Sequence, residues 1–259
     1  MAELLFWPAL IAYGQAAVAY FGDTRRPGVA GRVATWGVRV GWLVQTALLV
    51  AQATTADGFP WSSWAGSLNL FVWLVVGAYL IWGCRPRFRL LGLAVLPLAV
   101  VLFAVAHAGG GTSSNAGASS SAFLVAHVTL AVAAFAGFTL AAALSALYLW
   151  QERRLKRHAA GILRLPAPSL VTLDRLAGRT ITVALPLLTV GIVVGLVRVV
   201  RTHERFDALM VFTIVTWAVY AAYLFLRREL GWHGRRAAYV SLLGFALVIV
   251  VRLGLPHVS

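Results

Sequence analysis

Apolar residues run through this chain in long blocks that short polar gaps separate. A helix needs about 20 largely apolar residues to cross the hydrocarbon core of a bilayer. Eight blocks come close to that length or exceed it, and each predicts one membrane-spanning helix: residues 4–21, 33–53, 64–83, 90–107, 122–150, 180–200, 207–226 and 237–253. No gap is long enough for a soluble domain. The pattern therefore predicts an all-α integral membrane protein, a bundle of about eight transmembrane helices that forms a single transmembrane domain over residues 1–259.

The gaps between these blocks alternate in charge. The first, third, fifth and seventh gaps hold most of the 22 Lys and Arg residues, whereas the second (residues 54–63) and the fourth (residues 108–121) hold none. Short basic loops stay on the cytoplasmic side of a membrane. The alternation predicts a multi-pass protein of the cytoplasmic membrane, with both termini on the outer (periplasmic or extracellular) side.

Composition agrees with a membrane protein and excludes other classes. Charged residues make up only 12% of the chain, about half of their share in a soluble domain. The net charge of +14 would suggest nucleic-acid binding in a soluble protein. Here the cations lie in the gaps between predicted spans, so no nucleic-acid partner is expected. The only cysteine, Cys84, excludes an internal disulfide and a cysteine-rich metal site.

Two histidines are candidates for a metal site at the outer face. His127 opens the fifth block and His257 lies two residues from the end of the sequence, so the predicted topology puts both on the outer side. Two neutral imidazoles beside apolar and aromatic surface can ligate a heme iron. Simpler roles stay open, with His127 in the headgroup layer and His257 in a frayed terminus. His107 and His203, also near the outer face, are additional candidate ligands.

Charged and aromatic residues near the same face could complete such a site. Arg198 and Arg252 lie close to the outer ends of the sixth and eighth blocks. There they either extend outward to the interface or pair with anionic groups such as heme propionates. Trp61 and Trp64 lie at the outer rim before the third block, where they are candidates for packing against a porphyrin.

The sequence offers little support for catalysis or transport. It contains no Walker phosphate-binding loop, no His-Glu-x-x-His motif and no Gly-x-Ser-x-Gly elbow, so the protein is not expected to be an enzyme on its own. No carboxylate lies in the middle of a block, which argues against a proton-coupled transporter. A transport pathway would have few polar residues to use, chiefly Gln45, Thr46 and Asn69.

Three parts of the chain resemble segments of the CcsA-type cytochrome c assembly family, within the CcsA/CcmC/CcmF superfamily. The first runs from a loop proline through a Ser-Leu pair to a helical Trp, and the second is a helix that opens with a histidine and closes on a basic end. The third joins a Leu-Asp-Arg-Leu-Ala-Gly-Arg segment to a Trp-containing helix and a Gly-Trp-His-Gly turn. Together they occupy residues 58–73, 124–128, 147–156, 173–180, 185–195, 216–227 and 231–237.

This resemblance implies a role in heme handling. In the family, one periplasmic histidine opens the second segment and another follows the last helix, and these positions correspond to His127 and His257. The resemblance thus implies that this pair binds heme iron, as a low-spin heme b. It also implies that the chain assists cytochrome c maturation, beside a partner membrane protein that supplies missing parts.

Three departures separate the chain from the full heme synthetases of the family. Gly66 stands where the family usually has Glu, residues 200–207 contain no Trp where the synthetases carry a Trp-rich segment, and Phe225 replaces a membrane-embedded histidine. In these respects the chain resembles the HemX-like branch, which lacks the full tryptophan-rich heme motif. Three alternatives stay open: a regulatory or scaffolding membrane protein without its own cofactor, a small-molecule transporter, and an accessory subunit of a larger membrane complex.

Overall fold

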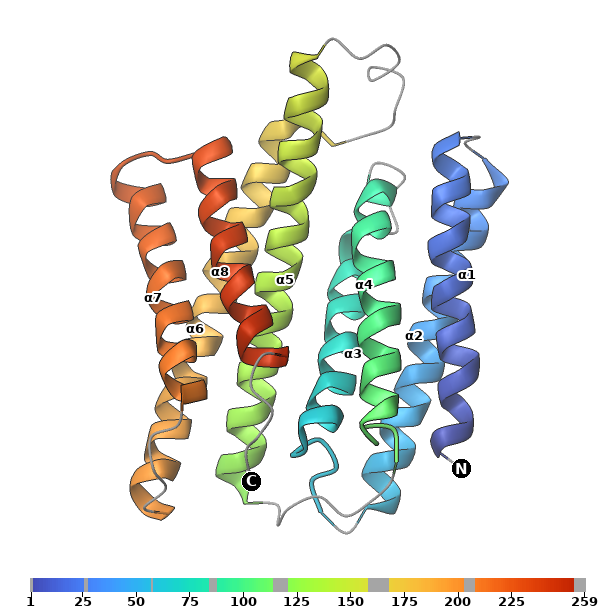
Figure 1. Ribbon diagram of the computed structural model, residues 1–259, viewed down its shortest axis with the longest axis vertical. Helices are drawn as coiled ribbons and strands as arrows, with labels where there is room; N and C mark the ends of the chain where they lie inside the picture. Colours follow the sequence, from blue (N-terminus) through green and yellow to red (C-terminus); the bar gives the residue numbers. More distant parts are fainter. Residues whose placement is uncertain are drawn as a thin grey trace. The chain divides into compact units, whose positions relative to one another are not determined.

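The computed structural model describes residues 2–25, 28–56, 58–83, 88–113, 121–157, 168–202 and 208–253. Within these ranges the chain forms eight α-helices (Figure 1), which confirms the predicted all-α fold and the number of helices. They are α1 (Phe6–Arg25), α2 (Val29–Thr55), α3 (Trp64–Gly83), α4 (Arg89–Ala108), α5 (Ala122–Lys156), α6 (Leu170–Thr202), α7 (Ala208–Glu229) and α8 (Arg235–Leu253). A short 3-10 helix, η1 (Ala2–Leu5), precedes α1.

Six of these helices, α2 to α7, are long and apolar enough to cross a membrane. Of the other two, α1 is less apolar because it contains Gln15 and Asp23, and the described side chains of α8 cover only residues 235–249, too few to be assessed as a span. The chain is therefore a multi-pass membrane protein. That α1 and α8 also cross, and that both termini lie outside, stay predictions.

The structure moves the start of one predicted helix by ten residues. α6 begins at Leu170, whereas the apolar pattern places the start of the sixth span at residue 180. Ser169 caps the helix, since its Oγ accepts a hydrogen bond from the backbone N–H of Thr172 at 3.2 Å. The added residues include Asp174 and Arg175, which are tolerated in a helix but are not apolar. A pattern of hydrophobic residues therefore detects the span and misses the helical extension before it.

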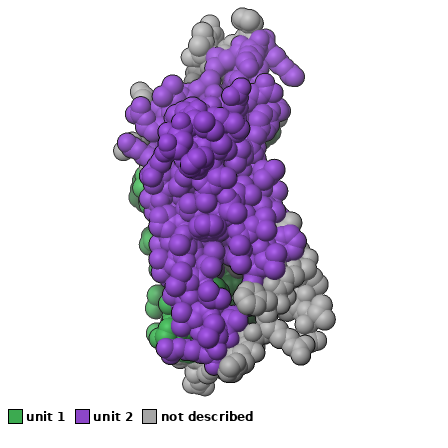
Figure 2. Space-filling model, turned by 90° about the vertical axis from the view of Figure 1, so that its left-hand side faces the viewer, with its two compact units in different colours: residues 1–128 green, residues 129–259 purple. Residues whose placement is uncertain are grey.

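The chain divides into two compact units, residues 1–128 and residues 129–259, coloured separately in Figure 2. The boundary lies inside α5, close to its start. Unit 1 thus contains α1 to α4, and unit 2 contains most of α5 together with α6 to α8. The prediction of a single transmembrane domain over residues 1–259 stays a prediction.

Unit 1 is an antiparallel arrangement in which α1 packs against α2 and α4, while α3 packs against α4 and α2 (Figure 1). Glycines let buried tyrosines lie directly on neighbouring helices. A Cβ atom at Gly41 would lie 2.7 Å from the ring of Tyr13, and one at Gly92 would lie 2.7 Å from the hydroxyl of Tyr79. Small residues at helix interfaces are the usual means of close approach in membrane proteins.

Unit 2 is organised around Tyr220 of α7, which is fully buried. Its ring is stacked on that of Phe138 from α5, with the centroids 3.8 Å apart and the planes 5° from parallel. The same ring occupies the space beside Gly244 of α8, where a Cβ atom would lie 2.7 Å from it. Between α5 and α6, Gly137 faces Ala184, and a Cβ atom at this glycine would lie 2.8 Å from the alanine Cβ. Small and aromatic residues thus join all four helices of the unit.

Candidate functional site

The two tryptophans proposed to pack on a porphyrin lie in the segment before α3 and at its first residue. Trp61 is partly exposed, and its indole Nε1–H donates a hydrogen bond to Gln52 Oε1 at 3.3 Å. Phe59 meets the Trp61 ring edge-on, with the centroids 5.5 Å apart. Trp64 is also partly exposed and lies over Gly109, where a Cβ atom would lie 2.9 Å from the indole. Both indoles therefore have fixed positions and retain some accessible surface.

A network of buried amides holds this segment in place. Gln45, Gln52 and Asn69 are each 0% exposed. The Nε2 group of Gln45 donates to Asn69 Oδ1 at 2.9 Å, and Asn69 Nδ2 donates to Gln52 Oε1 at 3.2 Å. Gln52 Nε2 then donates to the carbonyls of Gly111 and Ser113, at 3.0 and 2.8 Å. Side chains of α2 and α3 thus fix both the Trp61 segment and the residues that follow α4.

The same network bears on the transporter alternative. The polar groups of Gln45 and Asn69 are bonded to each other, and the hydroxyl of Tyr13 donates a further bond to Gln45 Oε1 at 2.8 Å. The Thr46 hydroxyl donates to the backbone carbonyl of Trp42 and accepts the indole N–H of Trp73. Buried amides bonded in this way stabilise helix packing, so these residues have a structural role that accounts for their polarity.

His107, an additional candidate ligand, is anchored inside unit 1. Its ring stacks on Phe6 of α1, with the centroids 3.7 Å apart and the planes 9° from parallel. Its Nδ1 atom shares a 2.6 Å hydrogen bond with Thr112 Oγ1, and the threonine is only 1% exposed. A histidine held through Nδ1 presents Nε2 to a ligand. The contacts also explain His107 as a packing residue, so its role as a ligand stays a prediction.

His127 and Arg198 both lie near the ends of long helices. His127 is partly exposed and lies one turn before Ala131 on the continuous helix α5. Arg198 is partly exposed too, about two turns after Gly191 on α6. In unit 2, Gly191 packs against Ala131, since a Cβ atom at this glycine would lie 3.4 Å from the alanine nitrogen. Ala131 of α5 and Gly191 of α6 therefore adjoin within this unit.

Other predicted site residues lie outside the described residues. These are His257 and His203. Arg252 is in the last turn of α8, but its side chain is not among those that the structure describes. The His127–His257 pair and the contribution of Arg252 therefore stay predictions. Within the described part of the chain, no three His, Cys, Asp or Glu residues gather as a metal site, but a heme iron needs at most two protein ligands.

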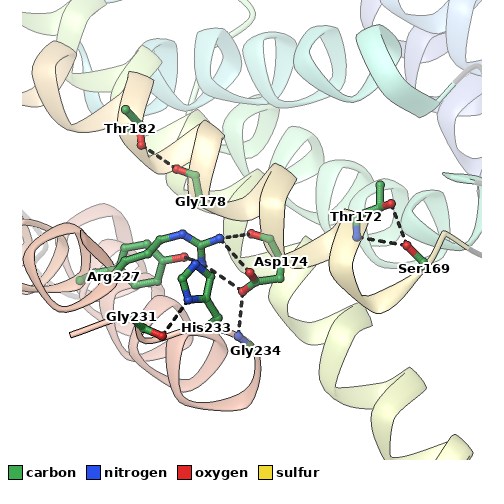
Figure 3. Close-up of polar contacts among 10 residues, drawn as sticks. Ser169, Thr172, Asp174, Gly178, Thr182, Arg227, Gly231, His233 and Gly234 are labelled. Carbon is green, nitrogen blue, oxygen red and sulfur yellow. Dashed lines mark hydrogen bonds and ion pairs between the residues drawn. The ribbon is translucent and has the colours of Figure 1, made fainter. Parts of the chain in front are cut away.

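A partly buried ion pair at the opposite end of unit 2 was not predicted. Asp174 of α6 accepts two hydrogen bonds from the guanidinium of Arg227 on α7, at 3.0 Å to Oδ1 and 2.8 Å to Oδ2 (Figure 3). The backbone N–H of Gly234, just before α8, donates to the same Oδ1 at 2.9 Å. Gly234 has a φ of +67°, and a Cβ atom there would lie 2.7 Å from the hydroxyl of Tyr148. One carboxylate thus joins α6, α7 and the turn before α8.

The sequence did contain a signal for this pair. Asp174 is one of only 8 acidic residues and lies in the most basic gap of the chain. Sequence reasoning treated Arg227 as a loop charge that sets orientation. In the structure, the side chains of Arg227 and Asp174 are only 15% and 14% exposed. A carboxylate among so many cations predicts a specific partner, because a bidentate pair with arginine satisfies both groups.

Comparison with known proteins gives a consistent result. The model of the family "Cytochrome C assembly protein" matches residues 61–258. Similar curated proteins include the cytochrome c biogenesis proteins CcsA of Mesostigma viride, 27% identical over 76% of this chain and 73% of the relative, and of Microcystis aeruginosa, 27% identical over 84% and 82%. That of Gloeobacter violaceus is 25% identical over 91% of this chain and 86% of the relative. No solved structure matches the chain significantly.

Proposed function

Since the chain belongs to the cytochrome c assembly protein family, we propose that it is a membrane protein that binds heme at its outer face during the maturation of c-type cytochromes. One observation carries this proposal. The family match covers residues 61–258 and so includes both His127 and His257, which the charge alternation places on the same side of the membrane without reference to the family. Its expected location is the cytoplasmic membrane.

The proposed axial ligands of a heme b are His127 and His257. The donor chemistry fits, because neutral imidazoles are ordinary ligands of heme iron. His127 is suitably placed for this role, since it is partly exposed near the start of α5. Two imidazoles on one iron favour a low-spin b-type site. His107 and His203 are reserve ligands, of which His107 has the hydrogen-bonded Nδ1 atom that is common among ligating histidines.

Neighbouring residues are proposed to orient the cofactor. Arg198 or Arg252 would bind a propionate through a bidentate guanidinium. Trp61 and Trp64 would pack against the porphyrin, and the hydrogen bond from Trp61 to Gln52 fixes the angle of one indole. The bound heme would supply the group that c-type cytochromes carry, whereas the chain's own residues hold and orient it. No residue of this chain is proposed to form the thioether bonds, so we do not propose an enzymatic activity for the chain on its own.

We propose that the chain belongs to the HemX-like branch and that it acts with a partner membrane protein of the assembly system. Phe225, at the position of the synthetases' embedded histidine, is 62% exposed on α7. An exposed phenyl ring cannot replace a ligand. Residues 200–207 contain no Trp, which likewise indicates that the chain lacks part of the synthetases' heme site. These departures favour a second candidate function, a regulatory or scaffolding membrane protein without its own cofactor.

A reduced-minus-oxidised absorption spectrum of detergent-purified protein, after reconstitution with hemin, tests the proposal. We expect a low-spin b-type signal in the wild type that is lost, or converted to high spin, in both His127→Ala and His257→Ala. His233→Ala is the matched control, because His233 is an exposed histidine bonded to the Gly231 carbonyl at the other end of unit 2. A colourless wild type, with all variants well folded, would reject heme binding and favour the scaffolding function.

A further inference from the structure

The end of unit 2 that contains the tip of α5 and the start of α8 is strongly basic. Four cations close α5 and two open α8, and all six are exposed. They are Arg153, Arg154, Lys156, Arg157, Arg235 and Arg236, and together they are called the α5–α8 basic patch below. The two helices meet here, since Gly234 before α8 lies against the hydroxyl of Tyr148 on α5. The patch is thus one continuous surface that two segments distant in sequence build together.

Two of these cations converge on a single phenol. Arg235 Nη2 donates a hydrogen bond to the hydroxyl of Tyr239 at 3.3 Å, and its guanidinium carbon lies 5.5 Å from the centre of the same ring. Arg153, from the end of α5, lies near the same side chain. The hydrogen bond to Tyr239 raises the pKa of Arg235, and an arginine is charged at physiological pH in any case. Two permanent cations are therefore held close together.

Acidic residues balance only a small part of this charge. Glu152 is near Arg235, but its carboxylate is already bonded to Lys156 at 2.7 Å. Asp174, the next carboxylate at this end, is bonded to Arg227. Glu229 closes α7 and adjoins the exposed Arg228. Like charges held a few ångströms apart repel each other unless an anion lies between them. The arrangement is therefore suited to an external anion.

Aromatic side chains place the patch at the level of lipid headgroups. The guanidinium carbon of Arg154 lies 4.7 Å from the ring centre of Trp150, and that of Arg236 lies 5.7 Å from Trp232. Tryptophan and tyrosine gather at the interface between hydrocarbon and water. Leu243, one turn further along α8 from Tyr239, is 57% exposed, as expected of a side chain that faces acyl chains. A ligand at the patch would therefore be in contact with the bilayer.

We propose that the α5–α8 basic patch binds the phosphodiester headgroups of anionic phospholipids in the leaflet that it faces, which the charge alternation makes the cytoplasmic one. The fork of an arginine guanidinium matches two phosphate oxygens, and Arg153 and Arg235 offer two such forks side by side. The flanking Trp150 and Tyr239 would contact the glycerol and upper acyl region. This role is independent of heme binding.

Native mass spectrometry of the detergent-purified full chain, titrated with phosphatidylglycerol or phosphatidylcholine, tests the proposal. We expect the wild type to bind phosphatidylglycerol selectively. In Arg153→Gln/Arg235→Gln the affinity should fall roughly 25-fold, since each basic residue near an anionic surface contributes about 5-fold. Arg175→Gln/Arg179→Gln is the matched control, because it removes two exposed arginines of α6 near the same end. This control should lose less than about 3-fold.

Two further measurements keep the test decisive. The glutamine double variant could fail to fold or insert in the wrong orientation. Arg153→Lys/Arg235→Lys then replaces it, because it keeps the charge that sets topology and loses the guanidinium forks. This lysine variant should bind phosphatidylglycerol several-fold more weakly than the wild type. Inorganic phosphate at the same concentration should not displace the lipid. Any one of four results would overturn the proposal. The first two are equal binding of the two lipids and equal losses in the two glutamine variants. The other two are unchanged binding in the lysine variant and displacement of the lipid by inorganic phosphate.

Discussion

Units 1 and 2 are both four-helix arrangements of apolar residues, but different polar interactions stabilise them. In unit 1, the neutral amides of Gln45, Gln52 and Asn69 form a chain of hydrogen bonds that is buried among the helices and fixes the loops next to them. In unit 2, the charged pair of Asp174 and Arg227 connects the helices near the basic end. Neutral amides can be buried within a membrane at modest cost, whereas charges are tolerated near its surface or in pairs. The pairing of Asp174 with Arg227 meets the second of these conditions.

The largest expected effect comes from breaking the charged pair. Asp174→Ala leaves Arg227 partly buried without its carboxylate and also removes the acceptor of the Gly234 N–H. We expect the free energy of unfolding in detergent to fall by about 3 kcal/mol, since removing one partner of a buried pair leaves an uncompensated charge. The control is Glu152→Ala, whose i,i+4 pair with Lys156 is exposed. It should cost less than about 0.5 kcal/mol.

A steric change in unit 2 should have the next largest effect. In Gly244→Ala the new methyl group would lie 2.7 Å from the ring of Tyr220, so the stack on Phe138 has to shift. Overpacking of this kind costs about 2 kcal/mol. Gly14→Ala in unit 1 is the matched control, because no atom lies within 4 Å of a Cβ atom there. Thermal unfolding of the two variants measures the difference, and equal effects would contradict the packing described for Tyr220.

The amide network of unit 1 can be tested with Asn69→Leu. This substitution keeps the branched shape of the side chain but removes its hydrogen bonds to Gln45 Nε2 and Gln52 Oε1, which keep only their bonds to the Asn69 backbone carbonyl and the Trp61 indole. We expect a loss of about 1 to 2 kcal/mol in the free energy of unfolding. The fluorescence of Trp61 should shift as well, since its indole is bonded to Gln52. An exposed threonine of α2, in Thr54→Val, is the control and should change neither quantity.

The smallest effect is expected at His107. In His107→Phe the ring can still stack on Phe6, but the hydrogen bond to Thr112 is lost. We expect a cost of about 1 kcal/mol in the free energy of unfolding. The heme spectrum should not change if His127 and His257 are the two axial ligands. A change from low spin to high spin in this variant would instead make His107 a ligand and displace one of that pair.

The sequence predicted the helices better than the polar contacts. Apolar blocks and charge alternation are properties of single segments, so eight helices could be read directly from the chain. The start of α6 was misplaced because Asp174 and Arg175 are helical without being apolar. The amide network was missed because it depends on which faces of α2 and α3 meet, and periodicity does not determine that. Gln45 and Asn69 therefore looked like isolated polar residues until their hydrogen bonds were seen.

The positions of several candidate site residues along the helices were predicted from the sequence, whereas their role in binding stays a prediction. His127, Arg198, Trp61 and Trp64 lie at helix ends or in the segments beside them, as the pattern indicated. The sequence alone could not predict the hydrogen bond that holds the Trp61 indole, because its acceptor Gln52 lies on α2 and Trp61 lies in the segment before α3. Contacts between helices depend on packing, which a single sequence encodes only through many weak preferences.

The length of α5 has a consequence for whatever approaches from the basic side. Its 35 residues extend about 52 Å at about 1.5 Å per residue, which is longer than the roughly 40–45 Å between the outer edges of the two headgroup layers. The excess length lets the basic tip extend through the headgroup layer on that side to the water beyond it. A soluble protein arriving there therefore meets the lipid headgroups and this tip together. For the same reason, trypsin added to that side should cut first after Arg153, Arg154, Lys156 or Arg157, which makes α5 a natural reporter of which way the protein is inserted.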